Sequence, residues 1–278
     1  MKTLILSDFH FGTPASRVER QLDGIRALAR QYDRVILNGD TLDRYEAPGC
    51  TPQAEALRKD IIEACSSRSG PPELVMGNHD PALSAIQWIY LEEAAALVFH
   101  GDCVADCTHP TRSDDRILAA RLRQHWQKLG GRPAQFVELS DIYRTVQAQH
   151  LLEYPLAREP RSTLTYLLRT IYPPQKPFHI LRYWRQTPRV AARLGATFPQ
   201  PVRHVFIGHT HRAGRWHIHG ITVHNTGSFM PMSVPCAASV EGAEISVRPL
   251  AALLGTTRAY SLPASGRAGV PEADEANA

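Results

Sequence analysis

The chain has 278 residues, and 43% of them are hydrophobic, which is enough to bury the core of one large domain or of one domain with an insertion. The formal charge of +4 is mildly basic and does not choose between a nucleic acid, an anionic membrane surface and a plain soluble protein. No apolar run approaches the roughly 18 residues that a bilayer-spanning helix needs. We therefore do not expect an integral membrane protein.

The cysteines and the N-terminus indicate a reducing compartment. The five cysteines are scattered and odd in number, which argues against a disulfide framework. No apolar signal core follows Lys2, and residues 3–10, "TLILSDFH", already contain the first expected strand, so the sequence does not indicate secretion. We therefore expect a cytoplasmic protein and leave open a peripheral contact with the inner face of a membrane.

Expected strands and helices alternate through the first hundred residues. The expected strands are residues 3–6, 34–40 ("RVILNGD"), 73–80 ("ELVMGNHD") and 96–102 ("ALVFHGD"), and the expected helices are 18–32, 53–65 and 81–96. Strands that alternate with helices predict an α/β domain with parallel pairing in its sheet.

This alternation is interrupted from residue 103 to about residue 202. Here the chain reads as amphipathic helix with proline-rich breaks, and strands return with "RHVFIGHTH", "GITVHNTGS" and "AEISVRPL". We predict a core made of residues 1–102 and 203–250 and a helical cap insertion at 103–202. Residues 251–278 form a C-terminal extension that we expect to be disordered from about residue 265.

Polar side chains follow the expected strands of the core. They are Asp8 and His10; Asp40, Asp43 and Arg44; Asn78, His79 and Asp80; His100; and His209 and His211. Loops at the carboxyl ends of strands in an open α/β sheet converge on one crevice, so these residues can meet although they are far apart in the chain.

Carboxylates, imidazoles and an amide without cysteine suit a borderline divalent ion such as manganese, iron or zinc. The number of donors suggests two ions. Asp40 is central among the strands and could bridge ions about 3.5 to 4 Å apart, the spacing typical of two-metal hydrolytic sites. Such a site favours phosphoester chemistry.

The motifs D-x-H, G-D-x-x-D-R, G-N-H-D, H-G and G-H-x-H, in this order, resemble the calcineurin-like metallophosphoesterase superfamily. The resemblance covers residues 1 to about 102 and 203 to about 250. It implies a four-layer αββα sandwich of two mixed sheets that carries the helical cap. It also implies one metal held by Asp8, His10, Asp40 and His211, and a second held by Asp40, Asn78, His100 and His209.

The resemblance further implies how the reaction proceeds. A hydroxide shared by two metals, manganese being the first expectation, would be the nucleophile. His79 would face the substrate as general acid, held in position by Asp43, and Arg44 would clamp a phosphate oxygen. Arg44, Asn78 and His79 are thus the expected substrate contacts. Asp80 is expected to fix the turn by local hydrogen bonds.

The insertion should determine the substrate, and several alternatives stay open. Its many arginines and aromatic residues could cover a lipid or an anionic membrane surface, bind single-stranded nucleic acid, or form an ordinary solvated face. A helical cap at this place is similar to that of UDP-2,3-diacylglucosamine pyrophosphatases, so an enzyme of that kind, acting on a nucleotide-linked lipid at the membrane surface, is an alternative function. Those enzymes typically carry arginine where this chain has His79. The sequence predicts a two-metal phosphoester hydrolase of unassigned substrate and no particular oligomeric state. A nucleic-acid-binding module and a non-catalytic scaffold are the alternatives of another class.

Overall fold

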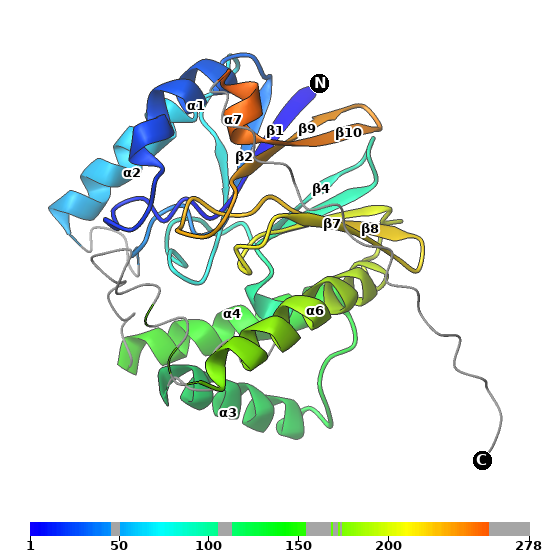
Figure 1. Ribbon diagram of the computed structural model, residues 1–278. Coiled ribbons are helices and arrows are strands. Elements are labelled where there is room, and N and C mark those ends of the chain that lie inside the picture. The colour runs from blue at the N-terminus through cyan, green and yellow to red at the C-terminus, as the bar shows by residue number, and fades with distance from the viewer. Residues whose placement is uncertain (46–50, 105–112, 154–167, 169–171, 173, 256–278) are drawn as a thin grey trace.

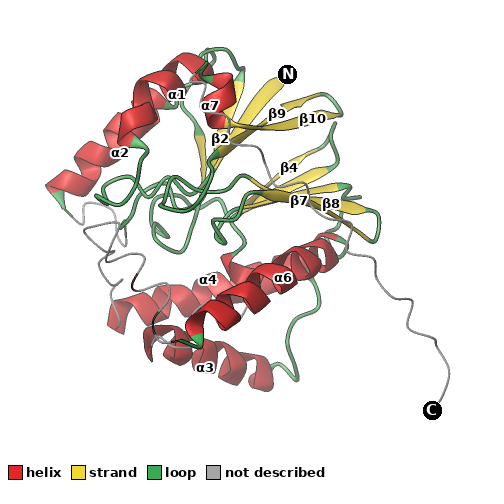
Figure 2. Cartoon of the chain, viewed as in Figure 1, coloured by secondary structure: helices red, strands yellow, loops and turns green. Residues whose placement is uncertain are grey.

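The computed structural model describes residues 1–45, 51–104, 113–153, 168, 172 and 174–255. Two mixed five-stranded sheets face each other, and helices cover both outer sides (Figures 1 and 2). The layers therefore follow the order helix, sheet, sheet, helix, which confirms the expected α/β sandwich of two mixed sheets.

The first sheet has the order β10-β9-β1-β2-β3, with β10 at Glu244–Pro249, β9 at Cys236–Glu241, β1 at Lys2–Leu6, β2 at Arg34–Asn38 and β3 at Glu73–Val75. Strands β1, β2 and β3 pair in parallel, and β9 pairs antiparallel with both β1 and β10. Its outer side carries η1 (Glu19–Gln21), α1 (Leu22–Ala29), α2 (Pro52–Ala64) and α7 (Leu250–Leu253).

The second sheet has the order β4-β5-β6-β8-β7, with β4 at Trp88–Leu91, β5 at Ala96–Phe99, β6 at His204–Ile207, β8 at Ile221–Asn225 and β7 at Gly214–Ile218. Strands β5, β6 and β8 are parallel, and the edge strands β4 and β7 are antiparallel to their neighbours. After β5 come η2 (Asp102–Val104), α3 (Ser113–Lys128), α4 (Phe136–Glu153) and α6 (Lys176–Gly195).

Alternation along the strands separates the apolar layers. In β1, Leu4 and Leu6 pack toward α1 and α2, whereas Ile5 points into the layer between the sheets. That inner layer joins Ile5 to Phe206 and Val98 of the second sheet. Each strand therefore contributes to two cores, and the sheets are held face to face.

The helices that follow β5 cover the outer face of the second sheet. Leu122 of α3, Phe136 of α4 and Ala191 of α6 belong to one buried cluster with Leu97 and Val205 of the sheet. The insertion thus supplies an outer helical layer of the sandwich. The division of the chain into a core and a separate cap stays a prediction, and the expected disordered tail lies outside the described residues.

The prediction of a helix at residues 81–96 is wrong. The structure has turns up to residue 87, followed by β4, which returns antiparallel along β5. Ile89 and Leu91 of β4 pack between the sheets, while Trp88 and Tyr90 contact the ring of Phe198 on the other side, Trp88 edge-to-face. Because both faces of the strand are apolar, its sequence lacks the polar alternation of a half-exposed strand.

Strand β9 was not expected. It begins with the small residues "CAAS", and β7 is a partly exposed edge strand with the sequence "GRWHI". Neither shows the apolar run that marks the central strands. Among the described helices, none combines the length and apolar character needed to span a membrane.

Candidate metal centre

The two loops that carry Asp8, His10 and Asp40 are fixed to each other by the continuing pairing of β1 and β2. Beyond the strand ends, the Asp8 amide donates to the Gly39 carbonyl at 3.1 Å, and the His10 amide donates to the Asp40 carbonyl at 2.9 Å. An isolated parallel bridge between Phe11 and Leu42 follows. The D-x-H and G-D motifs are thereby held side by side.

The loop after β6 is fixed to the same place. The His209 amide donates to Oδ1 of Asp8 at 2.8 Å, and the Gly208 amide donates to the His100 carbonyl at 2.8 Å. A Cβ atom added to Gly208 would lie 2.1 Å from Oδ2 of Asp8. Glycine at this position is therefore what allows the G-H-T-H loop to approach the D-x-H loop.

Five of the predicted ligands have a left-handed backbone. The φ angles are 54° for Asp8, 46° for His10, 46° for Asp40, 61° for His209 and 56° for His211. Such angles are uncommon for residues other than glycine and each costs on the order of 1 kcal/mol or more. Their concentration at the strand ends marks this cluster as a functional site.

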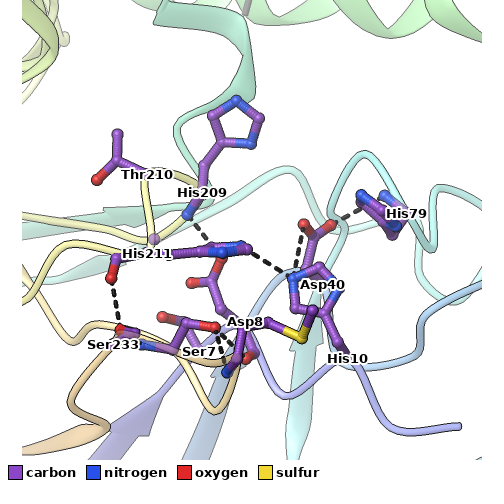
Figure 3. Close-up of polar contacts among 12 residues, drawn as sticks. Ser7, Asp8, His10, Asp40, His79, His209, Thr210, His211 and Ser233 are labelled. Carbon is purple, nitrogen blue, oxygen red and sulfur yellow. Dashed lines mark hydrogen bonds and ion pairs between the residues drawn. The ribbon is translucent and has the colours of Figure 1, made fainter. Parts of the chain in front are cut away.

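One group of side chains contains Asp8, His10, Asp40 and His211, whose potential ligand atoms lie within 4.8 Å of one another. Nε2 of His10 is 3.0 Å from Nε2 of His211, and Nε2 of His211 is 3.4 Å from Oδ1 of Asp8. Oδ2 of Asp40 lies 3.7 Å from Nε2 of His10. Figure 3 shows these side chains pointing toward a common centre.

A second group shares Asp40 with the first and adds His100 and His209, with ligand atoms again within 4.8 Å. Nε2 of His100 lies 3.3 Å from Oδ2 of Asp40 and 3.2 Å from Oδ1 of Asn78. The structure thus brings together all seven side chains predicted as ligands, with Asp40 common to both groups.

His79 and Asp43 lie beside the first group. Nδ1 of His79 is 3.0 Å from the backbone carbonyl of Asp43, and the Asp43 carboxylate is 3.7 Å from the imidazoles of both His79 and His10. The hydrogen bond that orients His79 is therefore made by the main chain of Asp43. Arg44 follows as a half-buried residue, and its predicted contact with phosphate stays a prediction.

The family model for calcineurin-like phosphoesterases matches residues 1–213, which is most of the chain and includes every motif described above. The chain belongs to the calcineurin-like phosphoesterase family. Comparison with curated proteins gave no match.

Solved structures similar to this calcineurin-like phosphoesterase are distant in sequence. A predicted phosphoesterase from Streptococcus pneumoniae TIGR4 is 13% identical, with 90% of this chain and 89% of that chain covered and a TM-score of 0.34. A Vps29 mutant from Entamoeba histolytica is 13% identical, with coverages of 89% and 90% and a TM-score of 0.39. A putative 5'-nucleotidase from Staphylococcus aureus is also 13% identical, with coverages of 89% and 52% and a TM-score of 0.32.

The donor atoms of this phosphoesterase fit divalent cations. Among the described residues, the buried atoms Oδ2 of Asp8, Nδ1 of His10 and Oδ1 of Asp43 make no hydrogen bond. Leaving a buried carboxylate oxygen without a partner is costly, and a cation would remove that cost. The set of oxygen and imidazole donors, without a thiolate, is typical of manganese, iron or zinc.

The tautomer of one ligand and the protonation of another suit metal binding, whereas burial would lower the pKa of His100 but Asp40 raises it well above its usual range, so a cation at this imidazole would displace a proton. Nδ1 of His100 is 3.0 Å from the Asn38 carbonyl and donates to it, which directs Nε2 toward Asp40. Burial raises the pKa of Asp8 to about 6. Burial acts in the same direction on Asp40, but the imidazoles of His100 and His79 hold the pKa of Asp40 well below its usual range. Burial and the neighbouring His10 lower the pKa of His211, so its lone pair is available at neutral pH.

Asp80 supports the site from behind. Its Oδ2 accepts from the amides of Thr41 and Leu42 at 2.7 and 3.0 Å, and its Oδ1 accepts from the Gly77 amide at 2.9 Å. These bonds connect the G-N-H-D turn to the loop of Asp40. The prediction that Asp80 fixes the turn is confirmed.

Sequence reasoning missed two supporting residues. Nδ2 of Asn225 donates to the Gly208 carbonyl at 2.7 Å and to Oγ1 of Thr210 at 3.0 Å, so it fixes the loop between the two histidines. The stretch "HNTG", which contains Asn225, is equally typical of a simple turn. Tyr183 of α6 places its ring 6.1 Å from that of His209, and no motif in the insertion signalled this.

Proposed function

We propose that this protein is a dinuclear-metal-dependent hydrolase of phosphoesters. The single observation that carries the proposal is that Asp40 belongs to two ligand groups at once, beside a histidine that belongs to neither. A carboxylate shared between two cation sites is the arrangement that two-metal phosphoester hydrolysis requires.

The residues divide into two ligand sets and one group for proton transfer. Asp8, His10, Asp40 and His211 would hold one ion, and Asp40, Asn78, His100 and His209 would hold the other. When bound, divalent ions would supply Lewis-acid polarisation of the phosphate and would acidify water so that it attacks at neutral pH.

His79 is proposed to protonate the leaving oxygen. Its Nδ1 donates to the Asp43 carbonyl at 3.0 Å, so the proton that it can transfer is the one on Nε2. Burial would raise the pKa of Asp43, but the neighbouring imidazoles of His10 and His79 lower it to about 2, so its carboxylate is charged at neutral pH. That negative charge 3.7 Å from Nδ1 of His79 favours the protonated imidazole. Arg44 is proposed to bind a phosphate oxygen.

The proposal is tested with p-nitrophenyl phosphate and bis-p-nitrophenyl phosphate. Protein stripped with a chelator should be inactive, and added manganese should restore hydrolysis of at least one ester. The Asp40→Asn variant should lose bound metal and turnover together, whereas Asp23→Asn, an exposed carboxylate on α1, should behave like the parent protein. Two tightly bound ions per chain without turnover of either ester or of nucleotide phosphates would contradict a hydrolase and support a binding role for the fold.

A further inference from the structure

The positive charge of the chain is concentrated in one stretch. Residues 160–240 contain ten Lys or Arg residues and no Asp or Glu, although the whole chain has 31 and 27 of these two classes. The stretch therefore carries a formal charge of +10, and the remaining residues together carry −6. The stretch itself contains no carboxylate with which its arginines could pair.

In the structure, a large part of this stretch forms one continuous layer. Helix α6 packs across β6, β7 and β8, with Ala191 and Leu194 in the same buried cluster as Val205 and Ile221 (Figure 1). Its opposite side is the outer surface of the molecule.

The outer side of α6 carries one ridge of arginines. Arg182, Arg185, Arg189 and Arg193 recur every three or four residues, so they share one face of the helix, and all four are exposed. We call these four residues the basic ridge. Within the part of the chain that the structure describes, none of them forms an ion pair, and α6 itself has no acidic residue.

Large apolar side chains extend the same face at its N-terminal end. Phe178 is 75% exposed and Leu181 is 52% exposed, and both lie on the side of the basic ridge. Just before α6, Leu168 and Tyr172 are 52% and 74% exposed. Exposed phenylalanine and leucine beside unpaired arginines are typical of helices that lie in a membrane interface.

We propose that the outer face of α6 binds the surface of an anionic lipid bilayer. The basic ridge would contact the phosphate groups of the lipids, and Phe178 and Leu181 would enter the boundary between headgroups and acyl chains. A single-stranded nucleic acid would also attract the arginines, but it gives a solvent-exposed leucine no apolar surface to enter. The aliphatic part of the face therefore favours lipid.

The same helix forms part of the wall of the metal centre. On its inner side, the centre of the Tyr183 ring lies 6.1 Å from that of the His209 ring. The guanidinium of Arg212, the residue after His211, lies 5.7 Å from the centre of the Trp184 ring. An α-helix with its side chains is about 10 Å across. A bilayer bound to the outer face would thus lie one helix diameter from the candidate metal ligands.

The test is co-sedimentation of the full chain with phosphatidylcholine vesicles, with and without phosphatidylglycerol. Binding should require the anionic lipid and weaken as salt is added. Reversing two ridge charges in Arg185→Glu/Arg189→Glu should raise the Kd about thirtyfold or more, since each basic residue near the surface contributes about 1 kcal/mol, which is about fivefold in Kd, and the two effects multiply. The milder pair Arg185→Gln/Arg189→Gln should give a smaller loss in the same direction.

The controls separate this surface from net charge and from catalysis. Arg20→Glu/Arg30→Glu makes the same charge change at exposed positions on the opposite helical layer and should keep vesicle binding. Phe178→Ser/Leu181→Ser should weaken binding even at high salt. Hydrolysis of p-nitrophenyl phosphate should be unchanged in all these variants, so this proposal and the hydrolase proposal can fail independently.

Three results would overturn the proposal. The first is that the parent protein does not bind anionic vesicles. The second is an equal loss in the ridge variant and in the control variant on the opposite layer. The third is tight binding of a single-stranded oligonucleotide that depends on the basic ridge, together with vesicle binding that does not change in Phe178→Ser/Leu181→Ser. This result would assign the surface to nucleic acid.

Discussion

Oδ2 of Asp40 lies 3.3 Å from Nε2 of His100, although the two residues follow strands of different sheets. Asp40 comes directly after β2 of the first sheet, and His100 comes directly after β5 of the second. The candidate centre therefore straddles the two sheets and depends on how they face each other. Substitutions that move one loop by a fraction of an ångström should impair metal binding without unfolding the protein.

Gly208→Ala is such a substitution. The new Cβ would lie 2.1 Å from Oδ2 of Asp8, so either the carboxylate or the loop of His209 and His211 must move. We expect metal affinity to fall by at least about tenfold, with an unchanged circular dichroism spectrum. Gly24→Ala is the matched control, because its Cβ would meet only the end of the flexible Leu254 side chain, at 2.7 Å. Normal manganese binding by Gly208→Ala in calorimetry would show that the close approach has no role.

Asn225→Ala should loosen the same loop without touching a ligand directly. The amide of Asn225 bonds the Gly208 carbonyl and Thr210, and its loss should lower metal affinity about 10- to 100-fold, as is usual for residues that orient metal ligands. The exposed Gln31→Ala, which loses one amide bond to the Ala27 carbonyl, serves as control. If excess manganese fails to restore the activity of Asn225→Ala, the residue does more than position the loop.

His79→Ala should separate proton transfer from metal binding. We expect both ions to stay bound and hydrolysis to slow by roughly 10²- to 10⁴-fold for esters with poor leaving groups. Esters with good leaving groups need less protonation and should be affected less. The measurement is the rate across a series of aryl phosphates, together with the metal content of each sample. Loss of metal from His79→Ala would show that the role assigned to this residue is wrong.

His224 should make the protein sensitive to acid. It is 3% exposed and stacks on Phe206 with 4.7 Å between the ring centres, and burial lowers its pKa to about 3. The unfolded chain takes up this proton near pH 6.5, so the stability is fully present above about 6.5 and is lost as the pH falls toward about 3. The slope from this group is on the order of 1.4 kcal/mol per pH unit.

The His224→Gln variant measures that contribution. Urea unfolding at about pH 7 and about pH 5 should show a smaller loss of free energy of unfolding in the variant than in the parent protein. Nδ1 of the neighbouring His204, whose pKa burial also lowers, lies 3.2 Å from Nε2 of His224, so the difference between the two proteins includes the interaction of this pair. Equal acid losses in the two proteins would mean that His224 does not stay neutral in the folded state.

Much of the fold was predictable because its central strands are local features of the sequence. Strands such as residues 3–6 and 96–99 are short apolar runs followed by polar residues, and the structure has strands at both places. The edge strands β3 and β10 were predictable in this way, but the edge strand β4 was not. Strand β4 is apolar on both faces, and β7 is partly exposed, so what makes each of them a strand is the neighbour with which it pairs.

The sequence by itself determined which side chains could form the centre, because each motif places its donors directly after a strand end. Only the tertiary structure decided that the main-chain carbonyl of Asp43, and not its carboxylate, makes the hydrogen bond that orients His79. It also decided that α6 turns Tyr183 toward His209 and its arginines outward. The physical reason is that these contacts join residues far apart in the chain. They depend on the left-handed backbone at the strand ends and on the packing of two sheets and a helix.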